Sequence, residues 1–331
     1  MVVYYSCAMS FVLKYKLRRY SKMSTKILDV YNAARQDTTN TVVTLVTHKG
    51  RFHSDDVMAT AILRYFFDDA GIVTKTVRTF TPAEDGYTDD TPNCIVYDIG
   101  LGQYDHHQAG TDAKHTYRFD KINDENGIEQ TLVRKYAAVG LIWKEIGAFW
   151  VGEKYADKIY EQVVKYIDDA DNGFVFNPFS NMIRYQNTDK PNATDEVHNM
   201  HFEDAVNIAS KLIGHTIRHF QYVSRCESAL QKLAKDGAAC LIADDFLPGA
   251  DDVCREHNIP FYVYPNERGG WCFKSINRNE DNNREHLLDI PDEVRKWEGV
   301  TFLHPSCFLG SAVTKERAIE ICEIIKSNNS K

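Results

Sequence analysis

The sequence lacks any long hydrophobic run and any excess of positive charge. No apolar stretch approaches the ~20 residues that a membrane-spanning helix needs, so we expect no membrane partner. The formal net charge is −8, which argues against a general nucleic-acid coat protein, because such proteins are normally basic. An acidic protein can still act on phosphate groups through bound metal ions, since the ions supply the positive charge.

Paired cysteines are also missing. The eight cysteines are scattered along the chain and form no C-x-x-C pair. This pattern favours reduced thiols in an intracellular, cytoplasmic protein over a disulfide framework or a zinc knuckle. We find no internal repeat and no low-complexity segment, and a length of 331 residues favours about two domains. The oligomeric state stays open.

The first 22 residues differ from the rest of the chain, because they contain five basic residues and no acidic one. An acid-poor basic leader is typical of an organelle-targeting segment, which would direct the protein to a mitochondrion or a nucleus. Equally, Met23 is a candidate start residue, with the preceding residues as upstream translation. A secretory signal is disfavoured, since the apolar part is short and the basic residues follow it. We assign residues 1–40 to a basic extension.

Short apolar runs alternate with helix-like segments from residue 42 onward. In the first half of the chain we predict strands over residues 42–47, 72–80 and 94–100, and helices over residues 56–69, 130–150 and 154–169. Strands that alternate with helices indicate βαβ units and a parallel sheet. The polar, turn-rich segment 187–197 is the best candidate for a domain boundary.

The second half begins with one long helix, which we predict over residues 202–236 from its apolar spacing. A smaller α/β unit follows, with strands over residues 238–243, 259–264, 271–276 and 300–304 and a helix over residues 314–326. We therefore divide the chain beyond the extension into a catalytic domain (41–195), a linker helix (196–236) and a C-terminal domain (237–331).

Histidines and carboxylates crowd into the turn between the first predicted strand and the first helix. His48, His53 and Asp55 lie there, at the carboxyl end of a strand, where open α/β sheets bind ligands. Imidazole and carboxylate side chains are suitable ligands for manganese, iron, zinc or magnesium. The alternative is that Ser54 or Asp55 only caps the helix and that the histidines are surface residues.

A second group of such residues follows the strand predicted over residues 94–100. Asp98 lies at the end of this buried strand, where an acid is costly unless it is paired or bound to a metal. Asp105, His106 and His107 come next, and adjacent histidines point in different directions, so one of the two faces a given metal. The aspartate before them is suited to orient an imidazole by hydrogen bonding.

A third group, Asp168-Asp169-Ala-Asp171-Asn172-Gly173, ends a predicted helix. Carboxylates at a helix C-terminus oppose the helix dipole, and a bound cation would relieve this unfavourable arrangement. A solvated turn is the alternative interpretation.

The order of these motifs resembles the DHH phosphoesterase superfamily, and within it the branch known as the melanocyte-proliferating-gene family. The matching motifs are Thr47-His48-x-Gly50-x-Phe52-His53-x-Asp55, a strand that ends in Asp98, Tyr104-Asp105-His106-His107-Gln108, Asp171-Asn172-Gly173 and Phe302-Leu-His304-Pro-Ser306-Cys307-Phe308-Leu-Gly310. Two residues depart from the branch, because Cys307 and Ser311 stand where it usually has glycine. A third, milder departure is Asp56, where the branch often has glutamate.

The resemblance implies two α/β domains, a parallel sheet flanked by helices in the first, and an active site with two Mn²⁺ or Mg²⁺ ions in the cleft between the domains. It implies that His48, His53 and Asp98 hold one ion and that Asp55, Asp98, His106 and one of Asp168 and Asp171 hold the other. Asp98 would bridge the ions, His107 would contact the phosphate, and Asp105 would support the histidines. Two ions ~3.5–4 Å apart can activate a shared water for in-line attack on phosphorus.

The resemblance also implies an activity, since animal members of this branch are described as nucleases that trim RNA from its 3′ end. We therefore expect a 3′–5′ exonuclease that acts on RNA, a short oligonucleotide or a nucleotide. The first alternative is an inorganic pyrophosphatase or nucleotide phosphatase that uses the same metals. The second is a binding protein that kept the fold and lost turnover, which the departures at Cys307 and Ser311 favour.

The C-terminal domain offers candidate substrate contacts. Arg268 could bind phosphate with its planar guanidinium, and Gly269 and Gly270 permit a close approach of the substrate. A plain hairpin turn is the alternative for these three residues. His304 and Ser306 follow a predicted strand and are candidates for contact with a terminal phosphate or a ribose.

Overall fold

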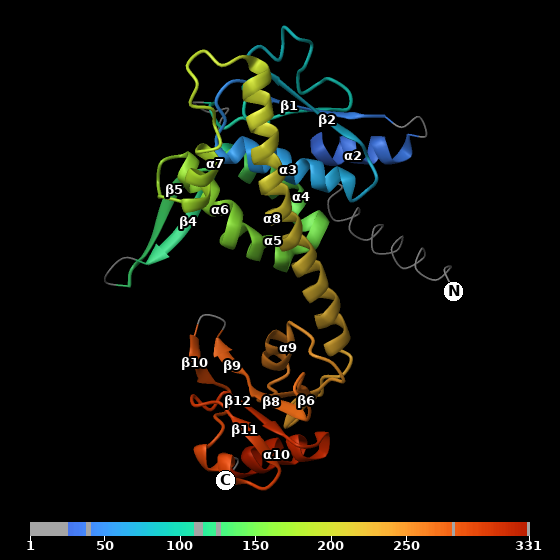
Figure 1. The fold of residues 1–331 in the computed structure, drawn as a ribbon, viewed down its shortest axis with the longest axis vertical. Helices are drawn as coiled ribbons and strands as arrows, with labels where there is room; N and C mark the ends of the chain where they lie inside the picture. Colours follow the sequence, from blue (N-terminus) through green and yellow to red (C-terminus); the bar gives the residue numbers. More distant parts are fainter. Residues whose placement is uncertain (1–25, 38–40, 109–114, 124–126, 280–281, 330–331) are drawn as a thin grey trace. The chain divides into compact units, whose positions relative to one another are not determined.

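The structure is a computed structural model that describes residues 26–37, 41–108, 115–123, 127–279 and 282–329 (Figure 1). The predicted leader over residues 1–22 lies outside the described residues. The chain divides into two compact units, Met1–Arg218 and His219–Lys331, and each is described by itself.

A three-stranded parallel sheet forms the centre of the first unit. Its middle strand β1 (Val43–His48) pairs with β2 (Thr74–Thr79) on one side and with β3 (Cys94–Val96) on the other. The run Val-Thr-Leu-Val-Thr in β1 is buried throughout, as expected for the central strand of a parallel sheet that is covered on both faces. The predicted α/β fold with a parallel sheet is therefore confirmed.

Helices pack on this sheet through aromatic and aliphatic side chains. Helix α3 (Ser54–Asp68) follows β1 directly and packs against α4 (Ala138–Val151). Helix α2 (Lys26–Gln36) belongs to the segment assigned to the basic extension, yet it packs on α4 and β3. Its Tyr31 ring lies 4.8 Å from the ring of Phe66 on α3, measured between centroids. The described part of that segment is thus built into the core of the first unit.

One predicted helix is wrong at its start. Residues 130–135 belong to β5 (Glu129–Lys135), which pairs antiparallel with β4 (Tyr117–Asn123), and α4 begins only at Ala138. Cross-strand pairing and the anchoring of this hairpin by the buried Arg118 override the local helical pattern. The arginine of β4, Arg118, pairs with Asp169 of a distant helix, a contact that the local sequence does not reveal.

The next two helical regions form where helices were predicted, but their boundaries differ from the prediction. The helix predicted over residues 154–169 consists of α5 (Glu153–Ile159), the π-helical turn η2 (Tyr160–Val164) and α6 (Lys165–Asp171). A short helix, α7 (Pro178–Arg184), was not predicted. Helix α8 (Asp195–Leu230) starts and ends earlier than predicted, and the boundary between the two units lies within it. No helix within the described ranges is long and apolar enough to cross a bilayer.

The second unit is a smaller α/β fold around a five-stranded sheet. The strand order is β11-β12-β8-β7-β6, and only β6 and β7 run parallel. The strands are β6 (Cys240–Ile242), β7 (Phe261–Pro265), β8 (Trp271–Ser275), β11 (Val300–Leu303) and β12 (Leu309–Ala312). Helix α10 (Lys315–Asn328) packs its apolar residues on this sheet, whereas α9 (Ala250–Glu256) belongs to a separate apolar cluster with β6 and β7.

Smaller elements complete this unit. They are the two-stranded β9 (Asn277–Asn279) and β10 (Asn282–His286) and the 3-10 turn η3 (Asp292–Lys296). These elements, together with α9 and β12, were not predicted.

Candidate metal centre

The end of β1 and the start of α3 bring two acids and two histidines together. His48 is the last residue of β1, and His53 caps α3 in a capping box with Asp56, whose Oδ1 accepts the His53 backbone N–H at 2.9 Å. The other oxygen of Asp56, Oδ2, lies 3.2 Å from His48 Nε2. Asp55 and Asp56 are both fully buried in the first turn of α3. The capping geometry therefore positions carboxylates in the interior at the end of a buried strand.

Asp98 lies at the neighbouring strand end, just beyond β3. Its backbone adopts a left-handed conformation with φ of +55°, and its N–H donates to Tyr104 O at 3.0 Å. Such a conformation is uncommon for residues other than glycine and tends to occur at functional sites. Because β3 pairs with β1, the Asp98 Oδ2 lies 3.3 Å from His48 Nε2. Asp98 Oδ1 lies 3.4 Å from His106 Nδ1.

The two adjacent histidines point to different partners. His106 is buried, and its Nε2 lies 3.1 Å from Asp171 Oδ2, so its ring links Asp98 with Asp171. The His107 side chain is 59% exposed, and its Nδ1 lies 2.7 Å from Asp105 Oδ1. Asp105 also accepts the backbone N–H groups of Leu101 and His107, which fixes its carboxylate beneath the imidazole.

Three groups of side chains could hold a metal ion. They are His48, Asp56 and Asp98; His53, Asp55 and Asp171; and Asp98, Asp105, His106 and His107. Within each group the candidate ligand atoms lie within 4.8 Å of one another. Asp98 belongs to two groups, which suits a bridging ligand. The resemblance paired His48 with His53 on one ion, whereas this geometry groups His53 with Asp55 and Asp171.

The buried polar atoms of these groups fit a cation. Within these groups, six buried atoms make no hydrogen bond to a described residue: His48 Nε2, both carboxylate oxygens of Asp55, Asp56 Oδ2, Asp98 Oδ1 and His106 Nδ1. Of these, His48 Nε2 still lies within ion-pair distance of Asp56 and Asp98. Buried polar atoms in proteins are nearly always hydrogen-bonded, and unpaired buried carboxylates are costly. Divalent ions would provide partners for these oxygens and nitrogens, which is the donor set that such ions accept.

Burial and neighbouring charges shift the pKa values of His48, Asp55 and Asp98. Burial raises the pKa of Asp55, and repulsion by Asp98 and Asp171 raises it further. Burial likewise raises the pKa of Asp98, although His48 acts against it. Burial alone would lower the pKa of His48, but its contacts with Asp56 and Asp98 outweigh this effect and raise the pKa to about 10. Without a metal, a protonated His48 would offset the negative charge of Asp56 and Asp98.

Asp168 has a different environment from Asp171. It is fully buried, and its Oδ1 accepts the backbone N–H groups of Ala137 and Gly140, each at 3.0 Å, at the start of α4. Its Oδ2 lies 3.2 Å from the Arg118 guanidinium. A Cβ at Gly140 would lie 2.1 Å from Asp168 Oδ2, so glycine is required there. The structure therefore gathers Asp171, and not Asp168, with the other candidate ligands.

Asp56 is the functional candidate that the sequence analysis missed. It was noted only as a departure from the glutamate of the family branch. Its position three residues after His53 is the signature of a capping box, which explains its first oxygen but not the buried second one. The turn from β1 into α3 brings that second oxygen to His48, and the pairing of β1 with β3 adds Asp98 to the group.

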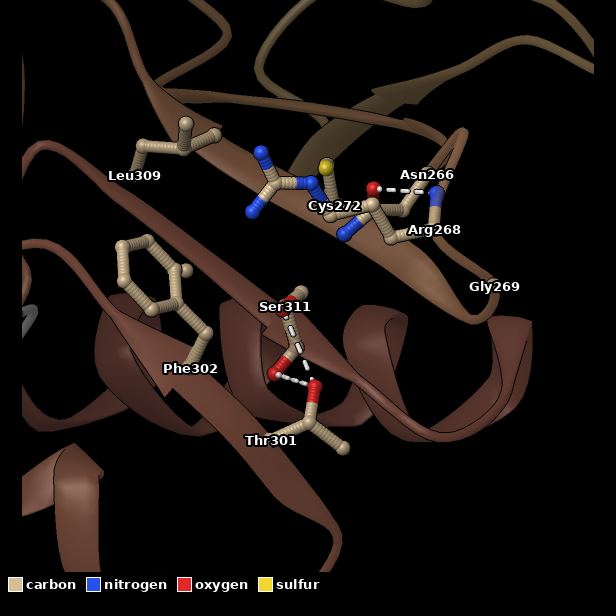
Figure 2. Close-up of a pocket in the computed structure, with 9 residues that line it drawn as sticks. Asn266, Arg268, Gly269, Cys272, Thr301, Phe302, Leu309 and Ser311 are labelled. Carbon is tan, nitrogen blue, oxygen red and sulfur yellow. Dashed lines mark hydrogen bonds between the residues drawn. The ribbon is translucent and has the colours of Figure 1, made fainter.

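The second unit contains a separate pocket of about 460 Å³ beside the turn that joins β7 and β8 (Figure 2). Arg268 and Gly269 line it, and the Arg268 side chain extends from the turn along the strands (Figure 2). Gly269 and Gly270 have φ values of +94° and +78°, and a Cβ at Gly270 would lie 2.4 Å from Ala312 O. Gly269 and Gly270 therefore form a turn, as the alternative interpretation predicted. The Arg268 side chain lies at the pocket beside this turn.

His304 and Ser306 do not line this pocket. They lie beyond β11, where the Ser306 backbone N–H donates to His304 Nδ1 at 3.1 Å. Cys307 follows with φ of +53°, in the left-handed region that favours glycine. Ser311, the other departure, does line the pocket, and its hydroxyl lies 2.9 Å from the Thr301 hydroxyl (Figure 2).

Known proteins resemble this chain at low sequence identity. The chain is 23% identical to the "MYG1 protein" of Dictyostelium discoideum over 327 residues, which cover 84% of this chain and 94% of that one. It is 24% identical to the "MYG1 exonuclease" of Homo sapiens, with 86% of each chain covered. Among solved structures, RecJ from Thermus thermophilus in complex with Mn²⁺ matches with a TM-score of 0.27 and 12% identity. That match covers 92% of this chain and 54% of RecJ, so the chain spans about half of its length.

A family model matches most of the sequence. It is MYG1_exonuc, described as "Uncharacterised protein family (UPF0160)", and the match runs over residues 44–325. This range includes every motif that carried the resemblance. The chain therefore belongs to the MYG1_exonuc family, as the order of its histidine and aspartate motifs indicated.

Proposed function

We propose that the protein is a divalent-metal-dependent phosphodiesterase, a 3′–5′ exonuclease that acts on RNA or short oligonucleotides. The observation that carries this proposal is the convergence of buried, unpartnered imidazole and carboxylate atoms on Asp98. Membership of a family whose human and mouse relatives are named exonucleases supports a nucleic acid as the substrate.

The residues present fit two Mn²⁺ or Mg²⁺ ions. His48, Asp56 and Asp98 would hold one ion, and His53, Asp55 and Asp171 the other, with His106 between Asp98 and Asp171. When bound, a pair of such ions supplies a water of lowered pKa and positive charge for the attacking and leaving oxygens of phosphoryl transfer. Mixed imidazole and carboxylate ligands favour manganese over magnesium, which prefers oxygen alone.

His107 is the protein group best placed to contact the substrate phosphate. Its side chain is half exposed, and the contact with Asp105 raises its pKa, so the ring carries a proton over a wider pH range. Asp105 acts as a positioning residue, because it holds Nδ1 and leaves Nε2 free to donate to a phosphate oxygen. A protonated imidazole would stabilise the charge that develops on that oxygen.

The second unit is proposed to supply further substrate contacts. Arg268, with Gly269 and Gly270 behind it, would bind a phosphate of the strand, because a guanidinium matches two phosphate oxygens at once. His304 and Ser306 remain candidates for contact with the terminal phosphate or ribose. No carboxylate among the described residues pairs with the Arg268 guanidinium, so its charge is free for an anion.

The test is an assay of the purified full chain with Mn²⁺ against single-stranded RNA, DNA, a dinucleotide and pyrophosphate. Substrates labelled at the 5′ end reveal the direction, since 3′–5′ trimming gives a ladder of labelled products. Asp98→Asn should be inactive, and Asp204→Asn, which changes an exposed acid of α8, should retain wild-type activity.

Two other outcomes of this assay would contradict the proposal. Phosphate release from pyrophosphate with RNA untouched would replace the proposal with the pyrophosphatase alternative. No hydrolysis of any of these phosphate compounds, despite metal binding by calorimetry, would reject an enzyme and favour a binding protein.

A further inference from the structure

An exposed aromatic segment follows the metal-binding group of α6. After Asp171 ends this helix, the chain passes through Phe174, Val175 and Phe176, all of which are exposed, before α7 begins at Pro178. Phe174 lies beneath the Arg134 guanidinium, 4.8 Å from the ring centroid. Phe176 is 79% exposed, and no ring or cation contact involves it among the described residues. Clustered exposed apolar side chains in a soluble protein tend to mark binding surfaces.

Helix α7 is fixed to the turn that carries the candidate ligands. Ser180 on α7 and Ser54 at the start of α3 share a hydrogen bond of 2.7 Å between their hydroxyls. The buried Asn187 side chain accepts the Phe52 backbone N–H at 3.1 Å and donates to Phe52 O at 2.9 Å. The segment beside the cluster is therefore anchored to the turn between β1 and α3, although its outward side chains are exposed.

A pocket of about 330 Å³ lies between these two parts of the first unit. His53 and Asp171 line one side, and Phe176, Asn181 and Arg184 line the other. Arg184 is exposed, and no carboxylate among the described residues pairs with it. The Arg184 guanidinium lies over the ring of neighbouring Tyr185, 5.5 Å from the centroid. The pocket is thus lined by two candidate metal ligands on one side and by the Arg184 guanidinium and the Phe176 ring on the other.

We propose that this pocket binds the terminal nucleotide of a single-stranded nucleic acid, with Arg184 on its phosphate and Phe176 stacked on its base. This inference rests on the proposed function for the chemistry at the metal centre, but it concerns binding. A guanidinium is the usual partner of phosphate, and an aromatic ring accepts any base because every base has a flat face. The proposal therefore predicts that the terminal base is bound with little sequence preference.

Binding is measured by calorimetry on the full chain with AMP and with inorganic phosphate, each with Mn²⁺ and with EDTA. Arg184→Ala should weaken both ligands about tenfold, since both carry the phosphate. Phe176→Ala should weaken AMP roughly 5- to 100-fold and leave inorganic phosphate unchanged, because only AMP has a base to stack. Phe176→Tyr should restore AMP binding.

Two matched variants control for non-specific effects. Arg225→Ala removes another exposed arginine that lies over a neighbouring tyrosine ring, and Met182→Ala removes an exposed side chain of α7 that does not line the pocket. Both should bind AMP as the wild type does. Thermal unfolding should be unchanged in all variants, since each altered side chain is exposed.

The outcomes separate this inference from the proposed function. Wild-type affinity for AMP in both Arg184→Ala and Phe176→Ala, or no AMP binding by the wild type, would overturn the subsite even if the enzyme trims RNA. The predicted pattern of AMP binding in a protein that hydrolyses nothing would support the subsite and defeat the proposed nuclease activity.

Discussion

The two units differ in the environment of their polar side chains. The candidate metal centre of the first unit buries acids such as Asp55 and Asp98, and several of their oxygens have no partner among the described residues. The pocket of the second unit keeps Arg268 at an open turn, and its buried hydroxyl, that of Ser311, is paired with Thr301. In the first unit, a bound cation would supply partners for the buried carboxylate oxygens. In the second unit, the buried hydroxyl already has a hydrogen-bond partner, and Arg268 offers a positive charge to an anion.

This difference indicates a division of roles. Gathering carboxylates in a protein interior costs stability, and proteins tolerate that cost where a bound ion or a reaction requires it. An exposed arginine costs little and gains most from a ligand that supplies two anionic oxygens. We therefore expect changes in the first unit to alter metal binding and catalysis, and changes in the second to alter substrate affinity.

The largest effect is expected for Asp98→Asn. Loss of an outer-shell partner of a metal ligand already costs roughly 10- to 100-fold, so loss of a shared ligand should lower kcat by more than about 100-fold. In EDTA the variant should unfold at a lower temperature than the wild type, because the change removes a carboxylate partner of the protonated His48. Initial rates with Mn²⁺ and thermal unfolding in EDTA measure the two effects. A variant that keeps wild-type kcat would exclude Asp98 from the metal centre.

The next effect separates two acids on one helix, Asp168 and Asp171. Asp168→Ala leaves two buried N–H groups and Arg118 without this acceptor, so the free energy of unfolding should fall by roughly 3 kcal/mol. Asp171→Ala should cost less stability in EDTA, because it removes one ion-pair contact, that with His106, and it should weaken Mn²⁺ binding. Chemical denaturation and metal titration of both variants test this. The opposite pattern would return Asp168 to the ligand set.

Metal addition should stabilise the protein through the first unit. At a free Mn²⁺ concentration about 100 times its dissociation constant, binding should add about 2.7 kcal/mol to the stability of the folded state. Asp55→Ala should abolish most of this gain, because it removes a ligand with two unpartnered oxygens. Arg268→Ala should retain it in full. Thermal unfolding with and without Mn²⁺ measures the difference, and equal gains in all three proteins would mean that the ion binds elsewhere.

Much of the first unit follows from local sequence. The strand β1 and the helix α3 are encoded by a β-branched run and a largely apolar run on either side of a turn rich in histidine and aspartate. The family resemblance supplied what local pattern could not, which was the expectation that His48, Asp98 and His106 meet. The ladder from β1 to β3 provides the physical reason for their meeting, since it aligns two strand ends that are far apart in the sequence.

The remainder depended on contacts between distant residues. Residues 130–135 read as helical because nothing local reveals the partner strand β4 or the ion pairs of Arg118 with α6. Asp168 and Asp171 look alike in the sequence. They differ in the structure because Asp168 accepts two backbone N–H groups at the start of α4. Strand β12 was missed because Gly310 and Ser311 have low strand propensity, while its neighbours β8 and β11 stabilise it.

A smaller effect is expected for Arg268→Ala in the second unit. Loss of a phosphate contact should raise KM for RNA about tenfold and leave kcat and Mn²⁺ affinity unchanged. Arg268→Lys should recover only part of the affinity, since an ammonium group cannot make the paired contact. Arg278→Ala, an exposed arginine on β9, is the matched control. A fall in kcat without a change in KM would contradict the division between the two units.

The smallest effect concerns Cys307, where the chain departs from the glycine of its family branch. A residue other than glycine in the left-handed region costs ~1–2 kcal/mol, but glycine loses more backbone entropy on folding by roughly 0.5–1 kcal/mol. Cys307→Gly should therefore raise stability by at most about 1.5 kcal/mol, measured by chemical denaturation. Cys307→Ala is the control, since it removes the thiol and keeps the strained backbone. If both variants lose the same stability, the thiol and its contact with Asp292 matter more than the backbone, and the departure at this position is an adaptation of the second unit.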